Sequence, residues 1–437
     1  MPNGSAGSVG AHTSSHTPSL ASLHTTAPQA GLHAVVSPSP LRAGGATEVL
    51  AAARALEAAG RHIVHLEVGE PDAPTPPHVV EAGVRALQAG LTRYAPPAGI
   101  PELRAAVADA FAARGVPADP ARVVVTPGAK AMIFTALLAA VRPGDEVLVP
   151  DPGYPAYAAV AELAGGRAVR YPLGAASDFA PDADAIATRL TARTRVLVLN
   201  APHNPTGGVA PPSALERLAD LALRHDLLVL SDEIYARHVY PDGPDDAAGG
   251  ATQPSIAALP GMAARTVLVD GVSKAYAMTG WRLGYGLLPA ALVRPVTALL
   301  ANSASCTATF VQHAGVAALR GPQDGVAAQA ELFRRRRDWL VAALNAIDGV
   351  RCAVPGGAFY AFPNVAGVLA RGGHTEESFA GRLLEGHGLA CVPGTAFGPG
   401  GAGHLRLAYT ASSEDLALAV ERLRACVAEV EGVGDAG

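Results

Sequence analysis

Short runs of valine and leucine alternate with helix-forming segments along this chain, and this alternation restricts the fold more than any other feature. The runs are "RVVVT" (122–126), "DEVLVP" (145–150), "RVLVLN" (195–200), "LLVLS" (227–231), "RTVLVD" (265–270) and "RLGYGLL" (282–288). Continuously apolar strands separated by helices are typical of a parallel sheet that is buried on both faces. We therefore expect an α/β fold with a mostly parallel sheet covered by helices.

The segments on either side of this region predict a smaller α+β domain. "ATEVLAAARALEAAG" reads as a helix that ends at Gly60, and "HIVHLEVG" reads as a strand. Near the other end are an arginine-rich helix around "AELFRRRRDWLVAALNAI", short strands near "FYAFP", "LACVPG" and "HLRLAY", and a last helix. We expect a large domain over 76–314 and a small domain formed by 46–75 together with 315–430.

Residues 1–40 are rich in Ser, Thr, His, Pro, Ala and Gly, and predict a disordered extension. Its histidines (His12, His16, His24 and His33) are too irregularly spaced for a preorganised metal site, and no metal is expected. The net charge of −5 argues against a broad nucleic-acid-binding surface. "AMIFTALLAAV" (131–141) is too short for a membrane span and predicts a buried helix. Four scattered cysteines without a CxxC pair favour a reducing, cytoplasmic setting.

Lysine is almost absent from the chain, although 33 residues are Lys or Arg. Only Lys130 and Lys274 are lysines. Codon composition most simply explains the preference for arginine. Because arginine can replace lysine where only charge matters, but not where an amine must lose its proton, the two lysines are informative.

Polar residues gather where the predicted strands end, which is where doubly wound sheets bind their ligands. The junctions are "TPGAKA" (126–131), "NAPHNPTGG" (200–208), "SDEIY" (231–235) and "SKAYAMTGWR" (273–282). Taken singly, each has an ordinary explanation: a glycine turn, turn chemistry, a structural aspartate or surface charge. Together they provide the parts that pyridoxal phosphate needs: a lysine for the Schiff base, a carboxylate for the pyridinium nitrogen and a phosphate-binding helix start.

Several separated motifs also occur in the order found in one family. They are "HLEVGEPDAPTP", "YAPPAGIPELR", "NAPHNPTGG", "SDEIY", "SKAYAMTGWRLGY", "GGAFY" and "HLRLAY". From about residue 46 to 430 the chain resembles the class I/II pyridoxal-phosphate-dependent aminotransferases, of the aspartate aminotransferase fold (fold type I). The resemblance implies a seven-stranded type of sheet in the large domain, and transfer of an amino group from an L-amino acid to a 2-oxo acid.

The resemblance implies a role for each matching residue around the cofactor ring. Lys274 would form the Schiff base and move the α-proton. Asp232 would pair with the pyridinium nitrogen and keep it protonated. Tyr235 and Asn204 would hydrogen-bond the 3-oxygen of the ring, and Tyr154 would stack on its face.

The phosphate would rest on the backbone of Gly128 and Ala129, the hydroxyl of Ser273 and the guanidinium of Arg282. Tyr94 would reach the phosphate of the neighbouring subunit, which implies a homodimer with shared active sites. One departure from the family pattern is Gly271, which stands where many relatives carry a serine that also touches the phosphate.

For the substrate, the resemblance implies that Arg406 binds the α-carboxylate as a bidentate pair, with contributions from Gly69 and Asn204. In some family members a lysine at the position of Lys130 meets the distal carboxylate of aspartate or a similar acid. Lys130 could equally just add positive potential near the phosphate. Alanine, branched-chain and aromatic amino acids therefore stay open as substrates.

Two other functions remain as alternatives. A lyase, decarboxylase or cyclising enzyme could use the same cofactor and fold, because fold alone does not determine the reaction. The N-terminal extension gives slight support to a catalytically silent binding or regulatory protein with the same fold, but the chain lacks a helix-turn-helix pattern and a basic patch, and Lys274 is present. Nucleotide binding is disfavoured, because no strand is followed by GxGxxG and no GxxxxGK[ST] motif occurs.

Overall fold

The computed structural model describes residues 45–240 and 252–434, with side chains described as far as residue 430. All of these residues belong to one compact unit, Ser39–Gly437. The disordered extension expected over 1–40, with its four histidines, lies outside the described residues.

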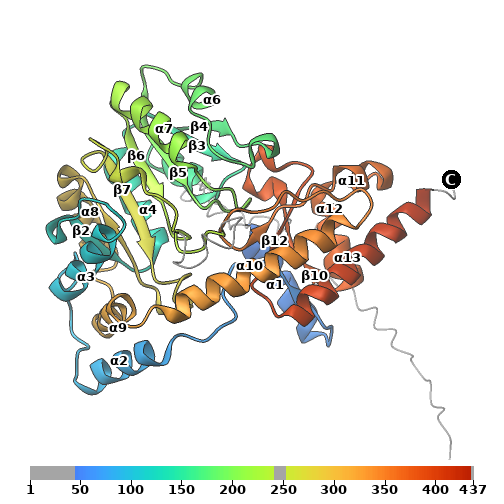
Figure 1. The fold of residues 1–437 in the computed structure, drawn as a ribbon, viewed down its shortest axis with the longest axis horizontal. Helices are drawn as coiled ribbons and strands as arrows, with labels where there is room; N and C mark the ends of the chain where they lie inside the picture. Colours follow the sequence, from blue (N-terminus) through green and yellow to red (C-terminus); the bar gives the residue numbers. More distant parts are fainter. Residues whose placement is uncertain (1–44, 241–251, 435–437) are drawn as a thin grey trace, which may run out of the picture. The chain divides into compact units, whose positions relative to one another are not determined.

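A seven-stranded sheet forms the centre of the fold, in the strand order β2-β8-β7-β6-β5-β3-β4 (Figure 1). Its strands are β2 (Val123–Thr126), β3 (Glu146–Asp151), β4 (Arg167–Pro172), β5 (Thr194–Asn200), β6 (Leu228–Asp232), β7 (Thr266–Gly271) and β8 (Gly284–Leu287). Only β8 runs in the direction opposite to the other six strands, so it pairs antiparallel with both β2 and β7. The mostly parallel α/β sheet expected from the sequence is therefore confirmed.

Helices cover both faces of this sheet because its strands are apolar on both sides. Val198 of β5 packs with helices α4 (Ala129–Ala140), α5 (Ala156–Leu163) and α8 (Ala290–Ser303). Its neighbour Leu199 packs on the other face, in the same cluster as residues of α6 and α7. These two helices are α6 (Ala183–Ala187) and α7 (Pro212–Arg224).

A further apolar cluster lies at the β2 end of the sheet. It joins strand residues such as Val125 and Tyr285 to helices α2 (Pro77–Gln88), α3 (Pro101–Ala112) and α9 (Thr309–Arg320). The apolar run at 131–141 lies in α4, which packs in the core as expected. Within 45–240 and 252–434, none of the helices combines the length and apolar character that a membrane span requires.

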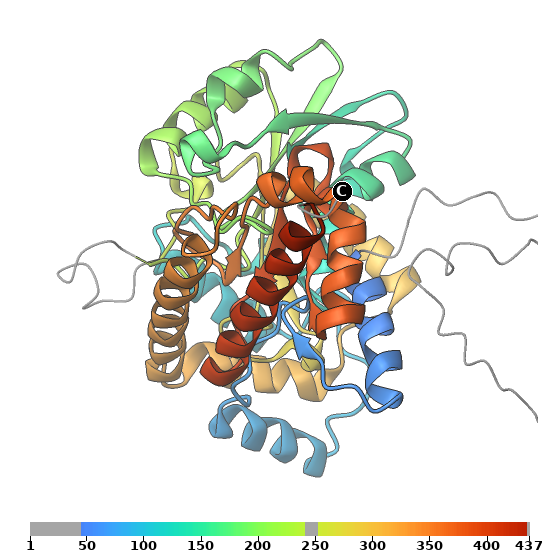
Figure 2. The same cartoon turned by 90° about the vertical axis from the view of Figure 1, so that its right-hand side faces the viewer.

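The first and last parts of the described chain pack together in one apolar cluster, which Ile234, Tyr235 and Tyr240 also join. Strand β1 (Val64–His65) pairs in parallel with β10 (Leu389–Ala390), far away in the sequence. Figure 2 shows this blue N-terminal segment beside the orange and red C-terminal helices. The remaining elements are α1 (Gly45–Ala58), α10 (Asp324–Asn345), β9 (Tyr360–Ala361), α11 (Ala366–Gly372), α12 (Glu376–His387), β11 (Val392–Pro393), β12 (Leu405–Ala408) and α13 (Ser413–Gly434). Strands β11, β12 and β9 form a three-stranded antiparallel sheet.

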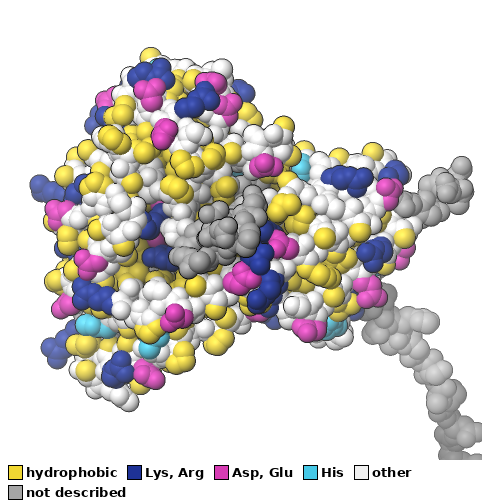
Figure 3. Space-filling view, viewed as in Figure 1, with side chains coloured by type: hydrophobic (Ala, Val, Ile, Leu, Met, Phe, Trp, Pro, Cys, Tyr) yellow, Lys and Arg dark blue, Asp and Glu magenta, His cyan; other side chains and the backbone are white. Residues whose placement is uncertain are grey.

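On the face drawn in Figure 3, lysine and arginine side chains lie interspersed with aspartate and glutamate side chains. That distribution fits the slightly negative net charge of −5. A nucleic-acid-binding surface needs basic residues gathered on one face, and this face does not gather them.

Candidate active site

The carboxyl ends of β5, β6 and β7 bring three of the sequence motifs to one edge of the sheet. Asn200 and Asp232 are the last residues of β5 and β6, and they pair with each other in register. Asp232 also pairs with Val269 of β7, and Lys274 follows shortly after β7 ends. Because these strands are parallel, "NAPHNPTGG", "SDEIY" and "SKAYAM" all begin at the same edge.

The Asp232 carboxylate is buried, with only 4% of the residue exposed. Its Oδ2 accepts a hydrogen bond from the Tyr157 hydroxyl at 2.7 Å, and its Oδ1 accepts one from the Ile234 N–H at 3.3 Å. Asn200 Nδ2 donates to the Asp232 carbonyl at 2.9 Å and fixes the backbone. Burial raises the pKa of the carboxyl to about 6, although the bond from Tyr157 opposes the rise. Among the described residues, no basic side chain forms an ion pair with this carboxylate.

The Lys274 amine is turned into the protein. Nζ donates a hydrogen bond to the Gly69 carbonyl at 2.7 Å and lies 5.8 Å from the centre of the Phe359 ring. Burial lowers the pKa of this amine to about 8; Glu70 raises it, and nearby cations such as Arg406 lower it. Near neutral pH a far larger fraction of this amine is therefore neutral, and so nucleophilic, than in a lysine with the ordinary pKa of 10.5.

Arg406, on β12, points a buried guanidinium toward the same region. Its Nη1 donates to Asn204 Oδ1 at 3.1 Å, and its Nη2 donates to the Glu67 carbonyl. The guanidinium also stacks 4.6 Å above the Tyr360 ring and 4.9 Å from the Phe397 ring. Only 4% of the residue is exposed, and Nε has no hydrogen-bond partner. No carboxylate balances this charge in the described chain, so the site can accept an anion.

Tyr235 is connected to Arg406 through Tyr360, a tyrosine that the sequence analysis did not assign. The hydroxyls of Tyr235 and Tyr360 lie 2.8 Å apart, and the Tyr360 ring lies against Arg406. Gly69 makes room for this arrangement, because a Cβ there would lie 2.0 Å from the Tyr360 hydroxyl.

The loop before α4 brings backbone N–H groups and a guanidinium together. Gly128 has φ +86°, a conformation that favours glycine, and a Cβ there would lie 2.4 Å from Nη2 of Arg282. α4 begins at the next residue, Ala129, so its free N–H groups and positive dipole end face this side. Arg282 is exposed and donates from Nη1 to the Thr279 carbonyl at 2.8 Å. Ser273, the fourth phosphate residue expected, is buried one residue before Lys274.

Of the other predicted site residues, Lys130 and Tyr154 contact each other, whereas Tyr94 contacts neither of them. Lys130 Nζ lies 5.6 Å from the centre of the Tyr154 ring, and Tyr154 meets Tyr157 edge to face at 5.6 Å between centres. Tyr94 is 88% exposed, and its side chain forms no hydrogen bond or ring contact with the described residues. Gly271, the departure noted above, is the last residue of β7.

The sequence analysis did not identify three residues that contact the predicted site residues. They are Tyr157, which binds Asp232; Asn200, which fixes its backbone; and Tyr360, which joins Tyr235 to Arg406. Weak signals existed, since Asn200 ends a predicted strand and Tyr360 ends the "GGAFY" motif. Tyr157 lies in "DPGYPAY", one helical turn beyond Tyr154.

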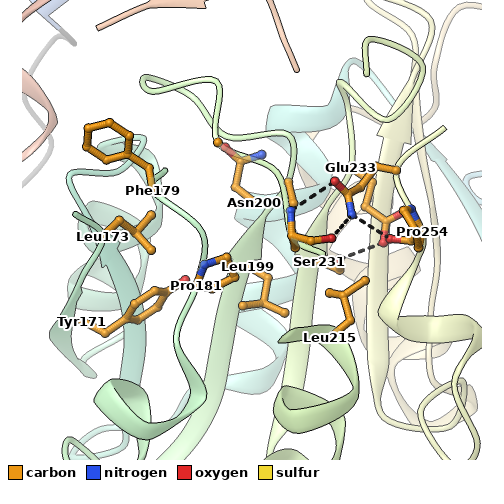
Figure 4. Close-up of a pocket in the computed structure, with 14 residues that line it drawn as sticks. Tyr171, Leu173, Phe179, Pro181, Leu199, Asn200, Leu215, Ser231, Glu233 and Pro254 are labelled. Carbon is orange, nitrogen blue, oxygen red and sulfur yellow. Dashed lines mark hydrogen bonds between the residues drawn. The ribbon is translucent and has the colours of Figure 1, made fainter. Parts of the chain in front are cut away.

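A small cavity behind this edge belongs to the core (Figure 4). Ser231 and Glu233 line it because they point away from Asp232 on the other side of the chain. Glu233 Oε1 accepts hydrogen bonds from Ser231 at 2.8 Å and Ser255 at 2.7 Å, and Arg114 pairs with its Oε2. The cavity of about 10 Å³ has room for roughly one water molecule, which is too small for a substrate.

A larger cleft, of about 640 Å³, opens beside the phosphate-type loop. The residues that line it include Pro127, Arg282, Glu70, Trp281, Cys306 and Phe310. Its volume is in the range of small-molecule sites. The cleft gives access to the loop before α4 from outside.

Comparison with known proteins gives a consistent answer. The model of the family "Aminotransferase class I and II" matches residues 61–423. An aspartate aminotransferase of Rhizobium meliloti (strain 1021) is 36% identical over 411 residues, covering 92% of this chain and 98% of that protein. An aspartate/prephenate aminotransferase of Cereibacter sphaeroides is 38% identical over 381 residues, covering 85% and 93%.

Solved structures agree. Aspartate aminotransferase from Thermus thermophilus with maleate superposes with a TM-score of 0.81 at 38% identity, covering 88% of this chain and 97% of that one. An aromatic aminotransferase from Pyrococcus horikoshii superposes with a TM-score of 0.78 at 37% identity, covering 83% and 95%. The chain belongs to the class I and II aminotransferases, pyridoxal-phosphate-dependent enzymes of fold type I that move an amino group between an amino acid and a 2-oxo acid.

Proposed function

We propose that this aminotransferase uses aspartate or glutamate as its amino donor, with Lys274 as the residue that moves the α-proton. The observation that carries the proposal is the state of the Lys274 amine. It is half-buried, bonded to a neutral carbonyl, and has a pKa lowered to about 8. A general base must hold its proton weakly enough to exchange it near working pH, and this amine meets that requirement.

The charges around the ring site fit pyridoxal phosphate. Asp232 is a buried carboxylate without a basic partner in the described chain, and burial raises its pKa to about 6. A cation against it would favour the ionised form, and a protonated pyridine nitrogen is such a cation. Tyr235 and Asn204 would hold the 3-oxygen, and Tyr154 would stack on the ring. When bound, the cofactor supplies an electron sink for the electrons of the substrate Cα–H bond.

The phosphate fits the loop before α4. Gly128 leaves the backbone open, Ala129 offers an N–H group at a helix start, and Arg282 lies next to Gly128. Ser273 would add a hydroxyl. Backbone N–H groups, a helix dipole and a guanidinium together form a strong site for a dianion.

Lys274 and Arg406 would act on different groups of the substrate, the α-proton and the α-carboxylate. Arg406 would bind the α-carboxylate, because its buried guanidinium now contacts only neutral groups and leaves Nε free. Gly69 and Asn204 would complete that contact. With the carboxylate held there, neutral Lys274 Nζ would take the proton from the α-carbon and return it later in the cycle.

Lys130 supports the acidic substrate class. Its ammonium lies over Tyr154, the residue proposed to stack on the ring, and so near where a substrate side chain would extend. Relatives named aspartate aminotransferase agree with this choice. Relatives named for aromatic substrates show that the side-chain preference varies in the family.

The alternatives have less support. Relatives that cover most of the chain are named aminotransferases, which disfavours the lyase or cyclising reaction. A silent binding protein would not need a half-buried amine of lowered pKa.

We propose that the enzyme is a homodimer. Tyr94 is 88% exposed, and α2 with the turn after it presents a row of exposed apolar side chains nearby: Val80, Val84, Leu87 and Leu91. A second copy would cover this row and bring its Tyr94 to the phosphate of the first.

We also propose that the chain divides into a large domain over 76–314 and a small domain formed by 46–75 together with 315–430. We further propose a cytoplasmic location, which four free cysteines favour.

Replacing Lys130 by Met should change substrate preference. Loss of one charge-assisted contact of about 1.5–3 kcal/mol lowers kcat/KM for aspartate and glutamate roughly 10- to 100-fold. For alanine or phenylalanine the change should stay within about threefold, and Lys130→Arg should retain part of the preference. Single-turnover reactions with each amino acid measure these effects. An equal loss for acidic and neutral donors would refute the selectivity role.

Replacing Asp232 by Asn should stabilise the protein that lacks cofactor. The folded pKa of about 6 lies above the ordinary 3.8, so this group stabilises the fold below about pH 4 and loses that contribution as pH rises through 6. Asn mimics the protonated form, so the variant should gain about 2–3 kcal/mol at pH 7.5.

Denaturant unfolding of the cofactor-free protein at pH 4 to 8 measures this difference, with the exposed Asp109→Asn as control. The gain should shrink toward pH 4. Adding pyridoxal phosphate should stabilise the wild type more than Asp232→Asn. A variant that is less stable than wild type at every pH, without cofactor, would contradict the account.

Co-expression tests whether Tyr94 acts across subunits. Tyr94→Ala and Lys274→Ala homodimers should both be inactive or weak. The mixed dimer combines Lys274 of one subunit with Tyr94 of the other in one complete site, so it should recover about half of the wild-type activity per dimer. No recovery in a purified mixed dimer would place Tyr94 in its own subunit's site, and a fully active Tyr94→Ala homodimer would show that Tyr94 has no role in either site.

A further inference from the structure

His65 lies between two glutamates, away from the cofactor site. Its Nδ1 is 2.8 Å from Glu67 Oε1, and its Nε2 is 3.0 Å from Glu57 Oε1. Glu57 belongs to α1, and Glu67 follows shortly after β1. The His65 and Glu57 side chains are 26% and 31% exposed, whereas Glu67 is fully buried. The three side chains therefore lead from the surface into the core.

With both glutamates ionised, the geometry requires two protons on the His65 ring. A neutral imidazole has one N–H group, and an ionised carboxylate can only accept. Because both ring nitrogens face carboxylate oxygens, only the imidazolium satisfies both contacts. Partial burial disfavours the charge, but the hydrogen bonds to Glu67 and Glu57 outweigh it and raise the pKa of His65 above its ordinary 6.5.

Glu67 connects this histidine to the substrate site. Its carbonyl accepts a hydrogen bond from Arg406 Nη2, while its carboxylate binds His65. The preceding residue, Leu66, accepts a hydrogen bond from the Ala408 N–H at 2.8 Å, at the end of the strand that carries Arg406. A movement of the Glu67 side chain therefore acts on a short backbone segment that touches Arg406 and its strand.

Other charged groups around these residues do not replace His65. Arg54, also on α1, binds the other oxygen of Glu57 at 3.0 Å. Cys391, the residue after β10, lies near Glu67 and near Cys426 of α13, and burial raises the pKa of both thiols, so they stay neutral. Arg422 of α13 donates to backbone carbonyls and to His62.

Glu67 depends on His65 for its charge balance. Among the described residues, His65 is the only basic side chain that forms an ion pair with Glu67, and Glu67 Oε2 has no hydrogen-bond partner. A buried carboxylate that loses its cation is strongly disfavoured, so the segment must rearrange or Glu67 must take up a proton.

We propose that His65 is a positioning residue for the substrate: its protonated ring holds Glu67 so that the Glu67 carbonyl orients Arg406 for the α-carboxylate. Loss of the ring proton to solvent releases Glu67 and weakens carboxylate binding. Affinity should thus be full below about pH 6.5 and fall as pH rises through the titration of His65. The inference rests on the proposed role of Arg406.

Kinetics of the holoenzyme test the proposal with four variants. At pH 6, His65→Gln should raise KM for the amino donor about five- to tenfold with kcat within about twofold, a typical size for coupling between sites. At pH 9 the wild type has lost the same charge, so the two should agree within about twofold. His65→Lys keeps a cation and should hold the low KM at both pH values. Glu57→Gln should show part of the effect, and the exposed Glu48→Gln on the same helix should show none.

Lys274 also titrates in this pH range, but it does so in every variant. Its effect on KM is therefore removed when the KM values of the variants are compared at the same pH. A His65→Gln defect in KM that is equally large at pH 6 and pH 9 would overturn the proposal, as would a defect confined to kcat. Failure of His65→Lys to restore KM, with correct folding shown by an unchanged unfolding midpoint, would also count against it.

A binding measurement gives a second readout that does not depend on turnover. If protonated His65 strengthens carboxylate binding, bound carboxylate must raise the pKa of His65 by the same factor, about 0.7–1 unit for a five- to tenfold effect. NMR titration of histidine-labelled holoenzyme with and without succinate measures this shift, and His65→Gln identifies the signal. An unchanged pKa of His65 with succinate bound would refute the proposed coupling between His65 and carboxylate binding.

Arg406→Ala separates this inference from the proposed function. If Arg406→Ala binds succinate as wild type does, the assignment of Arg406 itself is wrong. If Arg406→Ala abolishes binding while His65 variants leave it unchanged at all pH values, Arg406 keeps its role and only the His65 inference fails.

Discussion

Buried charge without a matching opposite charge is the constraint on which this site depends. Asp232 is an acid in the core with a pKa raised to about 6, and Arg406 is a buried cation bonded only to an amide oxygen and a carbonyl. Both arrangements cost stability in an empty protein. They become favourable when a ligand brings the missing partners: a protonated ring nitrogen for Asp232 and a carboxylate for Arg406.

Three segments far apart in the sequence must meet to build this arrangement. The sheet edge supplies Asp232 and Lys274, β12 supplies Arg406, and the segment after β1 supplies the Gly69 carbonyl that binds Lys274 at 2.7 Å. Gly69 cannot carry a side chain, because a Cβ would lie 2.0 Å from the Tyr360 hydroxyl. The segment after β1 and strand β12, which lie outside the seven-stranded sheet, therefore supply groups of the site itself. Through this segment Glu67 and His65 can influence how Arg406 binds the substrate.

Much of this could be predicted from the sequence, because strands buried on both faces give continuous apolar runs and their carboxyl ends must converge. All six predicted runs are strands of the main sheet. β4 was missed because it is an edge strand, and its exposed residues, Arg167 among them, interrupt the apolar pattern. Tyr157 and Tyr360 were missed for another reason: their importance lies in contacts with distant residues, and no local pattern encodes such contacts.

The central claim is that the half-buried amine of Lys274, and not that of the exposed Lys130, bonds to the cofactor aldehyde. Because the chain has only these two lysines, reduction of the loaded protein with borohydride followed by peptide mass mapping tests it directly. The account predicts one pyridoxyl-phosphate label per chain, on the peptide that contains Lys274. A label on Lys130, or none on either lysine in protein that retains the cofactor, would contradict it.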